Sequence, residues 1–440
     1  MTTLKTRDIL ALGFMTFALF LGAGNIIFPP SVGLAAGEFQ WSAALGFLLT
    51  GVGLPLLGVV ALARVGGGLD TLTSPIGKLA GTLMGLSIYL TIGPFFATPR
   101  TATVSFEVGM APFTGNTPEA LLMFTIGYFA LVMVLSLFPG KLMDNIGKII
   151  TPALIVVLSI LGIAAFVAPA GDIVTTPAPD YASAGQALAQ GFLQGYQTMD
   201  ALASLVFGII IVAAIKAAGV TDTRLHTRYT ILAGLIAATG LGLVYVSLVY
   251  LGGMSGSVVE AGASGVKILN TYVDNTFGTA GSFLLAAVIL LACLTTGVGL
   301  VSSCSAYFSE LLGVKYRTVV IVMSVFSAAV ANQGLEQLIT VAVPVLVAIY
   351  PVAMALIALG LMSKLFQHQA RVFIPVMTMA LLFGIVDALK AMGFGSIVPA
   401  ALDSLPGSAL GLGWLLPVAA TLALSAVLDR MRPAPAATTA

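Results

Sequence analysis

The sequence predicts an all-α integral membrane protein with twelve transmembrane helices. Of the 440 residues, 59% are hydrophobic and only 8% are charged, whereas soluble domains carry about 25% charged residues. Apolar runs of about 20 residues, the length that spans a bilayer, recur twelve times with short connections. The formal net charge of +1 argues against a nucleic-acid partner, which selects clustered lysine and arginine. We therefore expect a lipid bilayer around the chain and no separate soluble domain.

The basic residues support this number of spans. The predicted spans are residues 8–30, 41–63, 79–98 or 79–110, 119–138, 147–168, 186–215, 229–252, 281–306, 316–334, 337–362, 371–391 and 409–428. With the N-terminus in the cytoplasm, 15 of the 18 Lys and Arg residues, Lys141 and Lys148 among them, lie on the cytoplasmic side. Arg100, Lys267 and Lys390 lie on the other side. Basic residues gather on the cytoplasmic side of membrane proteins, so both termini are predicted to be cytoplasmic.

Two terminal features affect this topology. Lys5 and Arg7, followed by an apolar run, imitate a secretory signal peptide with a weak cleavage site at Ala35-Ala36. Its removal would break the predicted topology, so we interpret the run as the first span. Residues 429–440, which end in a stretch rich in Pro, Ala and Thr, are predicted to form a disordered cytoplasmic tail.

A long outer connection, residues 253–280, contains a short stretch with helical potential. Residues 264–269 read Ser-Gly-Val-Lys-Ile-Leu, and they suit an amphipathic lid helix. A plain solvated loop is the alternative interpretation.

The first span contains a stretch that disfavours a continuous helix. Gly22 and Gly24 each weaken a helix by about 1 kcal/mol relative to Ala, and Pro29-Pro30 removes two backbone donors. In lipid, a backbone that stops pairing with itself must face a cavity, an ion or a ligand. We therefore predict a helix break over Gly22–Asn25 that exposes backbone to a bound solute. The alternative is a glycine seam for close helix packing.

The sixth span has a polar centre. Within residues 191–208, Asp200 lies near the middle of the apolar run and so near the bilayer midplane. An ionisable group at that depth costs about 2.5–3.5 kcal/mol on insertion scales, which makes it a candidate functional residue. The structural alternative for Asp200 is a helix cap or a bond to a neighbouring span.

The two interrupted spans are five spans apart. Because five is odd, the second set of five spans runs in the opposite orientation to the first. Broken helices at corresponding positions predict an inverted repeat that holds substrate and ions between them. We assign residues 1–168 to the first repeat, 186–362 to the second and 371–428 to two accessory helices.

Three stretches resemble a known family, namely Phe20–Pro30, Gly93–Glu107 and Gly195–Gly208. The first, with Gly-Ala-Gly-Asn followed by Phe-Pro, resembles the broken first helix of LeuT-type transporters. Together the three resemble the bacterial branched-chain amino acid:cation symporter family, the BrnQ-like proteins, over essentially the whole chain. The resemblance implies a LeuT-like 5+5 fold in the bacterial inner membrane. It also implies import of leucine, isoleucine or valine with Na⁺ by alternating access.

The resemblance further implies a sodium site between the first and eighth spans. Residues 292–296, Ala-Cys-Leu-Thr-Thr, are similar to the family pattern of a small residue, two spacers and two hydroxyls. The implied ligands are backbone carbonyls and side-chain hydroxyls of Ala18, Leu21, Ala292, Thr295 and Thr296. A hydrogen bond of each threonine to its own preceding turn is the alternative, and Ser302 and Ser303 are the competing hydroxyl pair. By the same resemblance, Asn25 would offer an amide oxygen to a second ion site.

A zwitterionic amino acid needs donors for its carboxylate and acceptors for its ammonium group. The backbone N–H groups of Ala23, Gly24 and Asn25 are the candidate donors. Candidate acceptors are the carbonyls between Thr198 and Ala203, together with Asp200. The remaining predicted contacts of the substrate are Ser204 and the apolar residues Phe95, Phe96 and Phe207.

Two charged pairs and two cysteines are also informative. Arg100 and Glu107 lie two helical turns apart toward the outer end of the third span, and they form either an outer gate or a structural pair. Asp387 and Lys390 are predicted to form a surface pair. The two cysteines of the chain, Cys293 and Cys304, are predicted to lie about 16 Å apart along one helix, which is too far for a disulfide.

The alternatives differ in coupling ion and in class. Coupling to H⁺ through Asp200, or transport of another small neutral amino acid, is the first alternative on the same scaffold. A channel would need polar rings. An intramembrane enzyme would need a cluster of His, Cys, Asp or Glu. The sequence contains neither pattern, so we predict no enzymatic activity and Na⁺ as the coupling ion.

Overall fold

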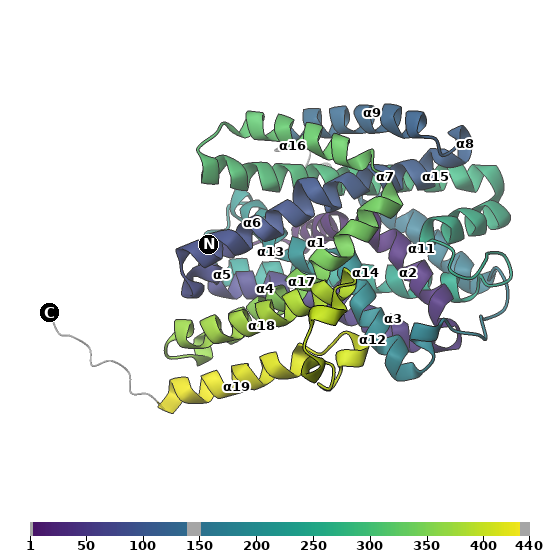
Figure 1. The fold of residues 1–440 in the computed structure, drawn as a ribbon. Coiled ribbons are helices and arrows are strands. Elements are labelled where there is room, and N and C mark those ends of the chain that lie inside the picture. The colour runs from purple at the N-terminus through teal and green to yellow at the C-terminus, as the bar shows by residue number, and fades with distance from the viewer. Residues whose placement is uncertain (1–2, 139–150, 432–440) are drawn as a thin grey trace.

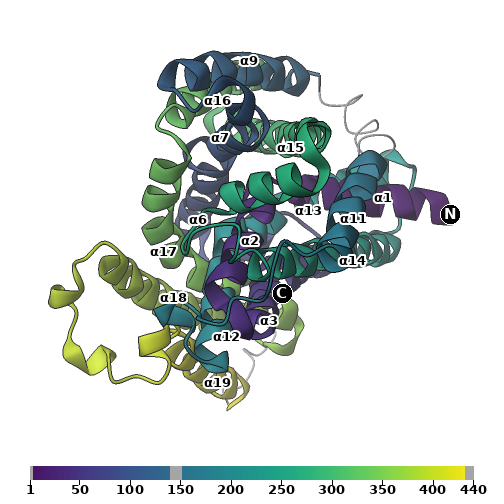
Figure 2. The ribbon, with the colours of Figure 1, turned by 90° about the vertical axis from the view of Figure 1, so that its right-hand side faces the viewer.

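The computed structural model of the chain describes residues 3–138 and 151–431, and all regular secondary structure in these ranges is helical. Lys141, Lys148, the beginning of the predicted span 147–168 and the tail from residue 432 lie outside these residues. Figure 1 shows the helices stacked in one bundle, and Figure 2 shows the same bundle after a quarter turn.

The predicted spans recur as helices, several of them divided. The helices of the first half are α1 (Thr6–Phe20), α2 (Ala23–Ala36), α3 (Gln40–Leu48), α4 (Leu54–Val65), α5 (Leu69–Thr73), α6 (Lys78–Leu90), α7 (Ala97–Gly109), α8 (Ala111–Thr114), α9 (Pro118–Ser136) and α11 (Thr151–Val167). Those of the second half are α12 (Ala184–Gln194), α13 (Asp200–Ala217), α14 (Thr223–Gly253), α15 (Gly265–Leu312), α16 (Tyr316–Ala331), α17 (Leu335–Met362), α18 (Gln369–Ala391) and α19 (Leu415–Met431).

The surface of the bundle is suited to lipid. Among the described residues, eight helices are long and apolar enough to cross a membrane. Large apolar side chains are exposed on the peripheral helices, including Met123 on α9, Ile163 on α11, Val325 on α16, Leu382 on α18 and Leu424 on α19. Water would oppose such a surface, whereas hydrocarbon does not. The chain is therefore a multi-pass membrane protein.

The most buried helices lie inside this shell. In both views α9 and α16 run side by side along one edge of the bundle, and α18 and α19 lie at the opposite edge (Figures 1 and 2). Nearly every residue of α2 and every residue in the first half of α13 are buried. These two helices begin at the interruptions of the first and sixth predicted spans.

Several helices depart from a single straight rod. The third predicted span is divided into α6 and α7 by a wider turn, η4 (Thr91–Phe95), in which Gly93 leaves helical geometry with ψ −118° beside Pro94. The sequence interpretation had no break here. Pro29 and Pro30, in contrast, lie inside α2, which continues through them to Ala36. The prediction that these prolines contribute to the first interruption is therefore wrong.

The stretch predicted as a lid helix or a loop is helical. α15 begins at Gly265 and bends at Gly278, where φ is 63°. An added Cβ on Gly265 would come within 1.7 Å of the Ile27 carbonyl oxygen, so only glycine lets this helix end lie so close to α2. Cys293 and Cys304 both lie in the long second part of α15, and both are free, buried thiols.

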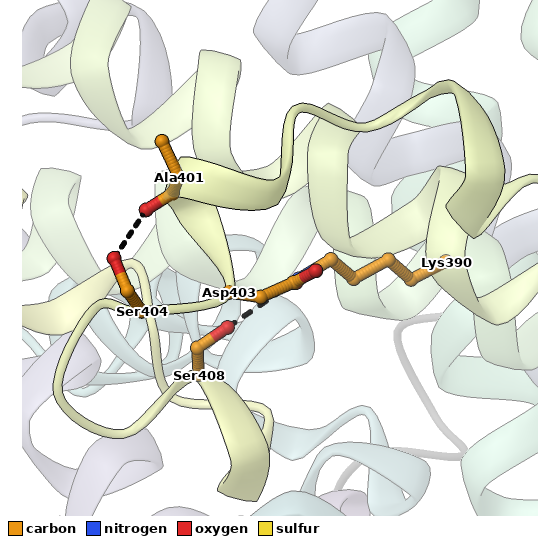
Figure 3. A network of polar contacts seen from close by, with 5 residues as sticks. All are labelled: Lys390, Ala401, Asp403, Ser404 and Ser408. Carbon is orange, nitrogen blue, oxygen red and sulfur yellow. Dashed lines mark hydrogen bonds and ion pairs between the residues drawn. The ribbon is translucent and has the colours of Figure 1, made fainter.

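The predicted pair of Asp387 with Lys390 is wrong. The Lys390 Nζ donates instead to Asp403 Oδ1 at 2.6 Å and to Ser408 Oγ at 3.4 Å (Figure 3). Residues 392–414 fold into short turns, and one of these turns brings Asp403 back over the end of α18. Ser404, whose hydroxyl donates to the Ala401 carbonyl at 2.7 Å, closes the same turn.

The boundary of the predicted C-terminal tail also changes. α19 extends to Met431, so residues 429–431 are helical. Asp429 is buried, and its carboxylate accepts hydrogen bonds from the backbone N–H groups of Gln367 at 2.6 Å and His368 at 3.1 Å. This contact ties the last helix to the start of α18.

Candidate functional site

A small cavity lies between the two helix interruptions. Its lining comes from the α1–α2 junction, η4, α7, the α12–α13 junction and α15, and consists of Leu19, Phe20, Gly22, Ala23, Gly24, Asn25, Ile92, Ala97, Arg100, Thr101, Thr198, Met199, Asp200, Ala203, Phe207, Thr296 and Leu300. Its volume is about 20 Å³ for the centre of a water-sized sphere. A larger hollow of about 590 Å³ exists near Asp70 and Glu310, but those charges are exposed.

The first interruption occupies two residues, Leu21 and Gly22, so the predicted break over Gly22–Asn25 is wrong in its bounds, because Ala23–Asn25 already form the first turn of α2. α1 ends at Phe20, Leu21 has ψ 82°, and Gly22 is extended with φ −108° and ψ −167°. The Asn25 side-chain oxygen accepts from the Gly22 N–H at 3.1 Å, so Asn25 caps the helix to which it belongs. An added Cβ on Gly24 would lie 3.0 Å from the Gln197 carbonyl oxygen. The glycine thus permits the start of α2 to touch the second interruption.

The second interruption is a turn, η7 (Gly195–Thr198), followed by Met199. Met199 has φ 62°, a left-handed conformation that a non-glycine residue adopts rarely and at a cost. The Thr198 hydroxyl donates to the Gly195 carbonyl at 2.9 Å and accepts from the Asp200 N–H at 3.3 Å. Asp200 therefore stands at the first position of α13, inside the molecule.

Asp200 is the centre of a buried hydrogen-bond network. Its Oδ2 accepts from Asn25 Nδ2 at 2.5 Å and from the Tyr245 hydroxyl at 2.9 Å. Asn25 Nδ2 also donates to the Tyr245 hydroxyl. These three residues join α2, α13 and α14. Sequence reasoning missed Tyr245, although a hydroxyl in the middle of the seventh apolar span was a signal that could have found it.

Arg100 lies in the cavity. The side chain is 2% exposed, and its Nη2 donates to the Gln197 carbonyl at 2.6 Å. Its guanidinium carbon stands 5.3 Å from the centre of the Phe28 ring. The prediction that Arg100 lies toward the outer end of its span is therefore wrong, because the turn η4 starts a new helix, α7, only three residues before it.

The predicted pair of Arg100 with Glu107 is not formed. Among the described residues, the ion pair within 4.0 Å is the one between Lys390 and Asp403. The Glu107 carboxylate lies by the Leu335 backbone N–H at the start of α17.

A group of oxygen atoms surrounds Thr296 beside the same cavity. The Thr296 Oγ1 lies 3.4 Å from the Ala18 carbonyl oxygen, 3.4 Å from that of Leu19 and 3.2 Å from that of Leu21. One hydroxyl carries one proton, so these three acceptors outnumber the donor between them. The Thr295 hydroxyl donates to the Ala292 carbonyl at 2.8 Å, as the alternative interpretation of that threonine held.

Three of the predicted substrate residues lie elsewhere. Phe95 is 40% exposed and packs edge-on against Phe326 at 5.6 Å. Phe96 is buried but is not part of the cavity lining. The Ser204 hydroxyl donates to the Ala201 carbonyl at 2.7 Å and faces α4 at Gly58. The other predicted substrate residues, namely Ala23, Gly24, Asn25, Thr198, Asp200, Ala203 and Phe207, all line the cavity.

The competing hydroxyl pair is not part of the cavity lining. The Ser303 hydroxyl donates to the Gly299 carbonyl at 2.7 Å, within its own helix. Within residues 3–138 and 151–431, no three His, Cys, Asp or Glu side chains gather as they would around a transition metal. The cavity therefore combines one carboxylate, one guanidinium and a set of neutral oxygens.

Comparisons with known proteins find relatives over nearly the whole chain. A family model described as "branched-chain amino acid transport protein" matches residues 5–432. The "branched-chain amino acid transport system 2 carrier protein" of Pseudomonas aeruginosa is 59% identical over 431 residues, which cover 98% of each chain. The "branched-chain amino acid permease BrnQ" of Escherichia coli is 52% identical over 427 residues, 97% of each chain. Both relatives are named as transport proteins and not as enzymes.

A solved structure resembles the fold. The crystal structure of MhsT in complex with L-phenylalanine matches with a TM-score of 0.61, covering 96% of this chain and 98% of that chain. The sequences are 16% identical, so the likeness concerns the fold alone. At that level, the LeuT-type fold expected from the sequence is confirmed.

Proposed function

The chain belongs to the branched-chain amino acid transport protein family, and on this premise we propose that it imports leucine, isoleucine and valine together with Na⁺. The observation that carries the proposal is the oxygen group around Thr296. Acceptors in excess of donors make this spot electronegative without a formal charge. Backbone carbonyls released by an interrupted helix are typical ligands of Na⁺ in such transporters. The proposed ligands are the carbonyls of Ala18, Leu21 and Ala292 with the hydroxyls of Thr295 and Thr296.

The substrate would lie in the cavity between the two interruptions. The N–H groups of Ala23, Gly24 and Asn25 begin α2, so they carry the positive end of its dipole and suit a carboxylate. Asp200 supplies the negative charge for the ammonium group, together with carbonyls near Thr198. The walls beside these polar groups are apolar, formed by Leu19, Phe20, Ile92, Ala203, Phe207 and Leu300.

The small size of the cavity supports a transport mechanism in which the helices that line it move. A cavity needs about 10–15 Å³, measured in this way, to hold one water molecule. The observed 20 Å³ is therefore too small for an amino acid side chain. Substrate binding requires the lining helices to separate, and alternating access of the kind used by inverted-repeat transporters provides such a motion. Rocking of spans 1, 2, 6 and 7 against the rest is the proposed motion.

The proposed topology has twelve spans in the bacterial inner membrane with both termini in the cytoplasm. The first ten form the inverted repeat, residues 1–168 and 186–362, and the last two are accessory. The distribution of basic residues supports this orientation. Some proposed spans consist of two shorter helices, as in α1 with α2. The number of spans therefore cannot be obtained by counting only the helices that are long enough to cross a membrane.

Proton coupling is the second candidate. The observation that favours it is the buried carboxylate of Asp200, which lines the substrate cavity and accepts two hydrogen bonds. Carboxylates at this depth serve as proton carriers in pumps and transporters. Na⁺ is the first choice, because three carbonyl oxygens face the single hydroxyl proton of Thr296.

Uptake of radiolabelled leucine into proteoliposomes tests the proposal. An inward Na⁺ gradient is expected to drive accumulation of leucine above its outside concentration, and isoleucine and valine are expected to compete. Matched vesicles receive K⁺ in place of Na⁺, with or without an inward proton gradient.

The outcomes separate the two coupling ions. Accumulation driven by protons alone would contradict the Na⁺ site and support Asp200 as the coupling group. Absence of leucine, isoleucine and valine uptake under every gradient, by protein that remains folded, would contradict the proposed substrate.

A further inference from the structure

Arg100 is a buried cation whose hydrogen-bonding groups are only partly used. One Nη2 proton goes to the Gln197 carbonyl, while Nε and Nη1 have no hydrogen-bond partner among the described residues. The side chain is 2% exposed, so water does not supply the missing acceptors from bulk. A buried cation in this condition is costly unless an anion completes its contacts.

No side chain of the described residues forms an ion pair with Arg100, although the charge of Asp200 attracts the guanidinium from a greater distance. Asp200 is the carboxylate that lines the same cavity, yet it stands farther than 4.0 Å from the guanidinium nitrogens. Its Oδ2 is already engaged by Asn25 and Tyr245. The Phe28 ring stabilises the charge of Arg100 but does not accept the N–H groups that point outward in the plane of the guanidinium. The cavity that Arg100 lines is therefore the place from which a further acceptor can reach it.

The guanidinium geometry fits a carboxylate. Arginine presents its N–H groups in two pairs along two edges, each of which can bind both oxygens of a carboxylate. Nη2 contributes one proton to each edge. Whichever of its protons is given to Gln197, a complete pair remains along the other edge.

The start of α2 lies beside the same nitrogen. An added Cβ on Gly24 would be 3.1 Å from Arg100 Nη2, which places the guanidinium next to the first turn of α2. The residues of that turn, Ala23, Gly24 and Asn25, and Arg100 therefore line one small cavity together.

We infer that Arg100 binds the α-carboxylate of the transported amino acid, together with the N-terminus of α2, and so selects substrates that carry a free carboxylate. The inference rests on the proposed amino acid site. It assigns the carboxylate to the α7 side of the cavity and leaves Asp200 for the ammonium group. Leucine amide and leucinol, which keep the ammonium group and the side chain but have no carboxylate, would lose this contact.

Competition binding to purified protein in nanodiscs tests the inference. Displacement of radiolabelled leucine by leucine, leucine amide and leucinol is measured for the wild type, Arg100→Gln and Arg100→Lys. Arg64→Gln is the matched control, because Arg64 also donates to a backbone carbonyl, that of Leu361 at 3.1 Å, but lies outside the cavity.

The expected result is a change in selectivity. Charged hydrogen bonds are worth about 1.5–3 kcal/mol, so the wild type should bind leucine about 10- to 100-fold more tightly than leucine amide. Arg100→Gln should weaken leucine by a similar factor and leave leucine amide within about 2-fold. Arg100→Lys, which keeps the charge without the paired edge, should fall between the two. Arg64→Gln should match the wild type.

Two results overturn the inference while the proposed function stands. One is an equal loss of affinity for leucine and leucine amide in Arg100→Gln, which indicates a structural role. The other is an unchanged preference for leucine. If the wild type binds no branched-chain amino acid, the proposed function fails first, and the inference fails with it.

A measurement on the wild type covers the case in which Arg100→Gln does not fold. Modification of Arg100 by phenylglyoxal is followed by mass spectrometry of its peptide. Leucine should protect Arg100, and leucine amide at an occupancy-matched concentration should not. Equal protection by both ligands, or by neither, contradicts the inference.

Discussion

Two groups of oxygen atoms border the same cavity, and they differ in how their hydrogen bonds are satisfied. Around Thr296, carbonyl oxygens at the end of α1 face one hydroxyl that has a single proton to give. Around Asp200, the carboxylate receives directed hydrogen bonds from Asn25 and Tyr245. The first group has acceptors in excess and no formal charge. The second has a charge that its own donors already stabilise.

This difference indicates which group can exchange a ligand. A neutral oxygen set leaves no unpaired charge behind when a cation departs. Removing a partner from a buried charge, in contrast, costs about 3–5 kcal/mol. Asp200 therefore keeps Asn25 and Tyr245 as fixed partners that stabilise its charge whether or not a substrate ammonium group is bound, and the Thr296 group is suited to a reversible ion site. Variants that disturb one group and spare the other test this difference.

Asp200→Asn should have the largest effect. An amide places an NH₂ or a neutral oxygen where two donors converge, and it removes the only carboxylate lining the cavity among the described residues. We expect leucine uptake to fall by about 100-fold or more, in line with the cost of disrupting a buried charge. Initial uptake rates in proteoliposomes, at equal amounts of reconstituted protein, check this. Glu107→Gln is the control, since Glu107 lies on α7 outside the cavity lining. Wild-type affinity and rate in Asp200→Asn would return Asp200 to a purely structural role.

Thr296→Ala should have the next largest effect, and on Na⁺ more than on leucine. The change removes the hydroxyl oxygen that faces the carbonyls of Ala18, Leu19 and Leu21. Loss of one ligand should raise the Na⁺ concentration for half-maximal uptake about 10-fold, equivalent to about 1.4 kcal/mol. The measurement is a Na⁺ titration of uptake at saturating leucine. Ser303→Ala is the matched control, because the hydroxyl that it removes donates to the Gly299 carbonyl within α15 and lies outside the cavity lining. A normal titration in Thr296→Ala would exclude this group as the ion site.

Tyr245→Phe should have a moderate effect. The substitution removes one of the two donors to Asp200 and keeps the ring that packs edge-on against Phe47 at 5.2 Å. One hydrogen bond to a charged group is worth about 1.5–3 kcal/mol, so leucine affinity should fall about 10-fold or slightly more. Leucine binding isotherms at saturating Na⁺ measure the change. If the Na⁺ titration shifts and the leucine isotherm does not, Asp200 and Tyr245 belong to an ion site instead.

Phe95→Ala and Ser204→Ala should have the smallest effects on substrate affinity. Phe95 packs against Phe326 at the periphery, and Ser204 faces α4. The half-saturating leucine concentration should stay within about 2-fold of the wild type, because neither side chain lines the cavity. Uptake measured over a range of leucine concentrations checks both variants. A selective loss of valine or isoleucine uptake in either would mean that the substrate site extends beyond the cavity.

The two helix interruptions could be placed from the sequence because they depend on local composition. Glycines beside Asn25, and a polar stretch around Asp200, are incompatible with an undisturbed helix in lipid. The contact between Thr296 and the carbonyls at the first interruption was predicted only through the resemblance to a family. The local sequence around Thr296 does not indicate which carbonyls its hydroxyl faces. The prolines of α2 misled the interpretation. Pro29 and Pro30 are buried inside α2, and the helix continues through both of them because its packed surroundings hold it in place.

The contacts that were missed depend on tertiary placement. Arg100 lies in the cavity because Gly93 and Pro94 end one helix and allow α7 to begin in a new direction. A count of residues along a continuous span could not reveal this. The partner of Lys390 was missed for a similar reason, since the turns that carry Asp403 back are set by packing beyond the helix end.

Leucine binding to the purified protein as a function of Na⁺ shows directly whether the ion site and the substrate cavity are coupled. In detergent or nanodiscs no gradient exists, so only the coupling between the two sites is measured. If Na⁺ at the Thr296 group and leucine in the adjacent cavity stabilise one conformation, each must tighten the binding of the other by the same factor. We predict that saturating Na⁺ tightens leucine binding about 10-fold or more in the wild type and that Thr296→Ala removes the effect. Leucine affinity that is equal in Na⁺ and in K⁺ would contradict the claim.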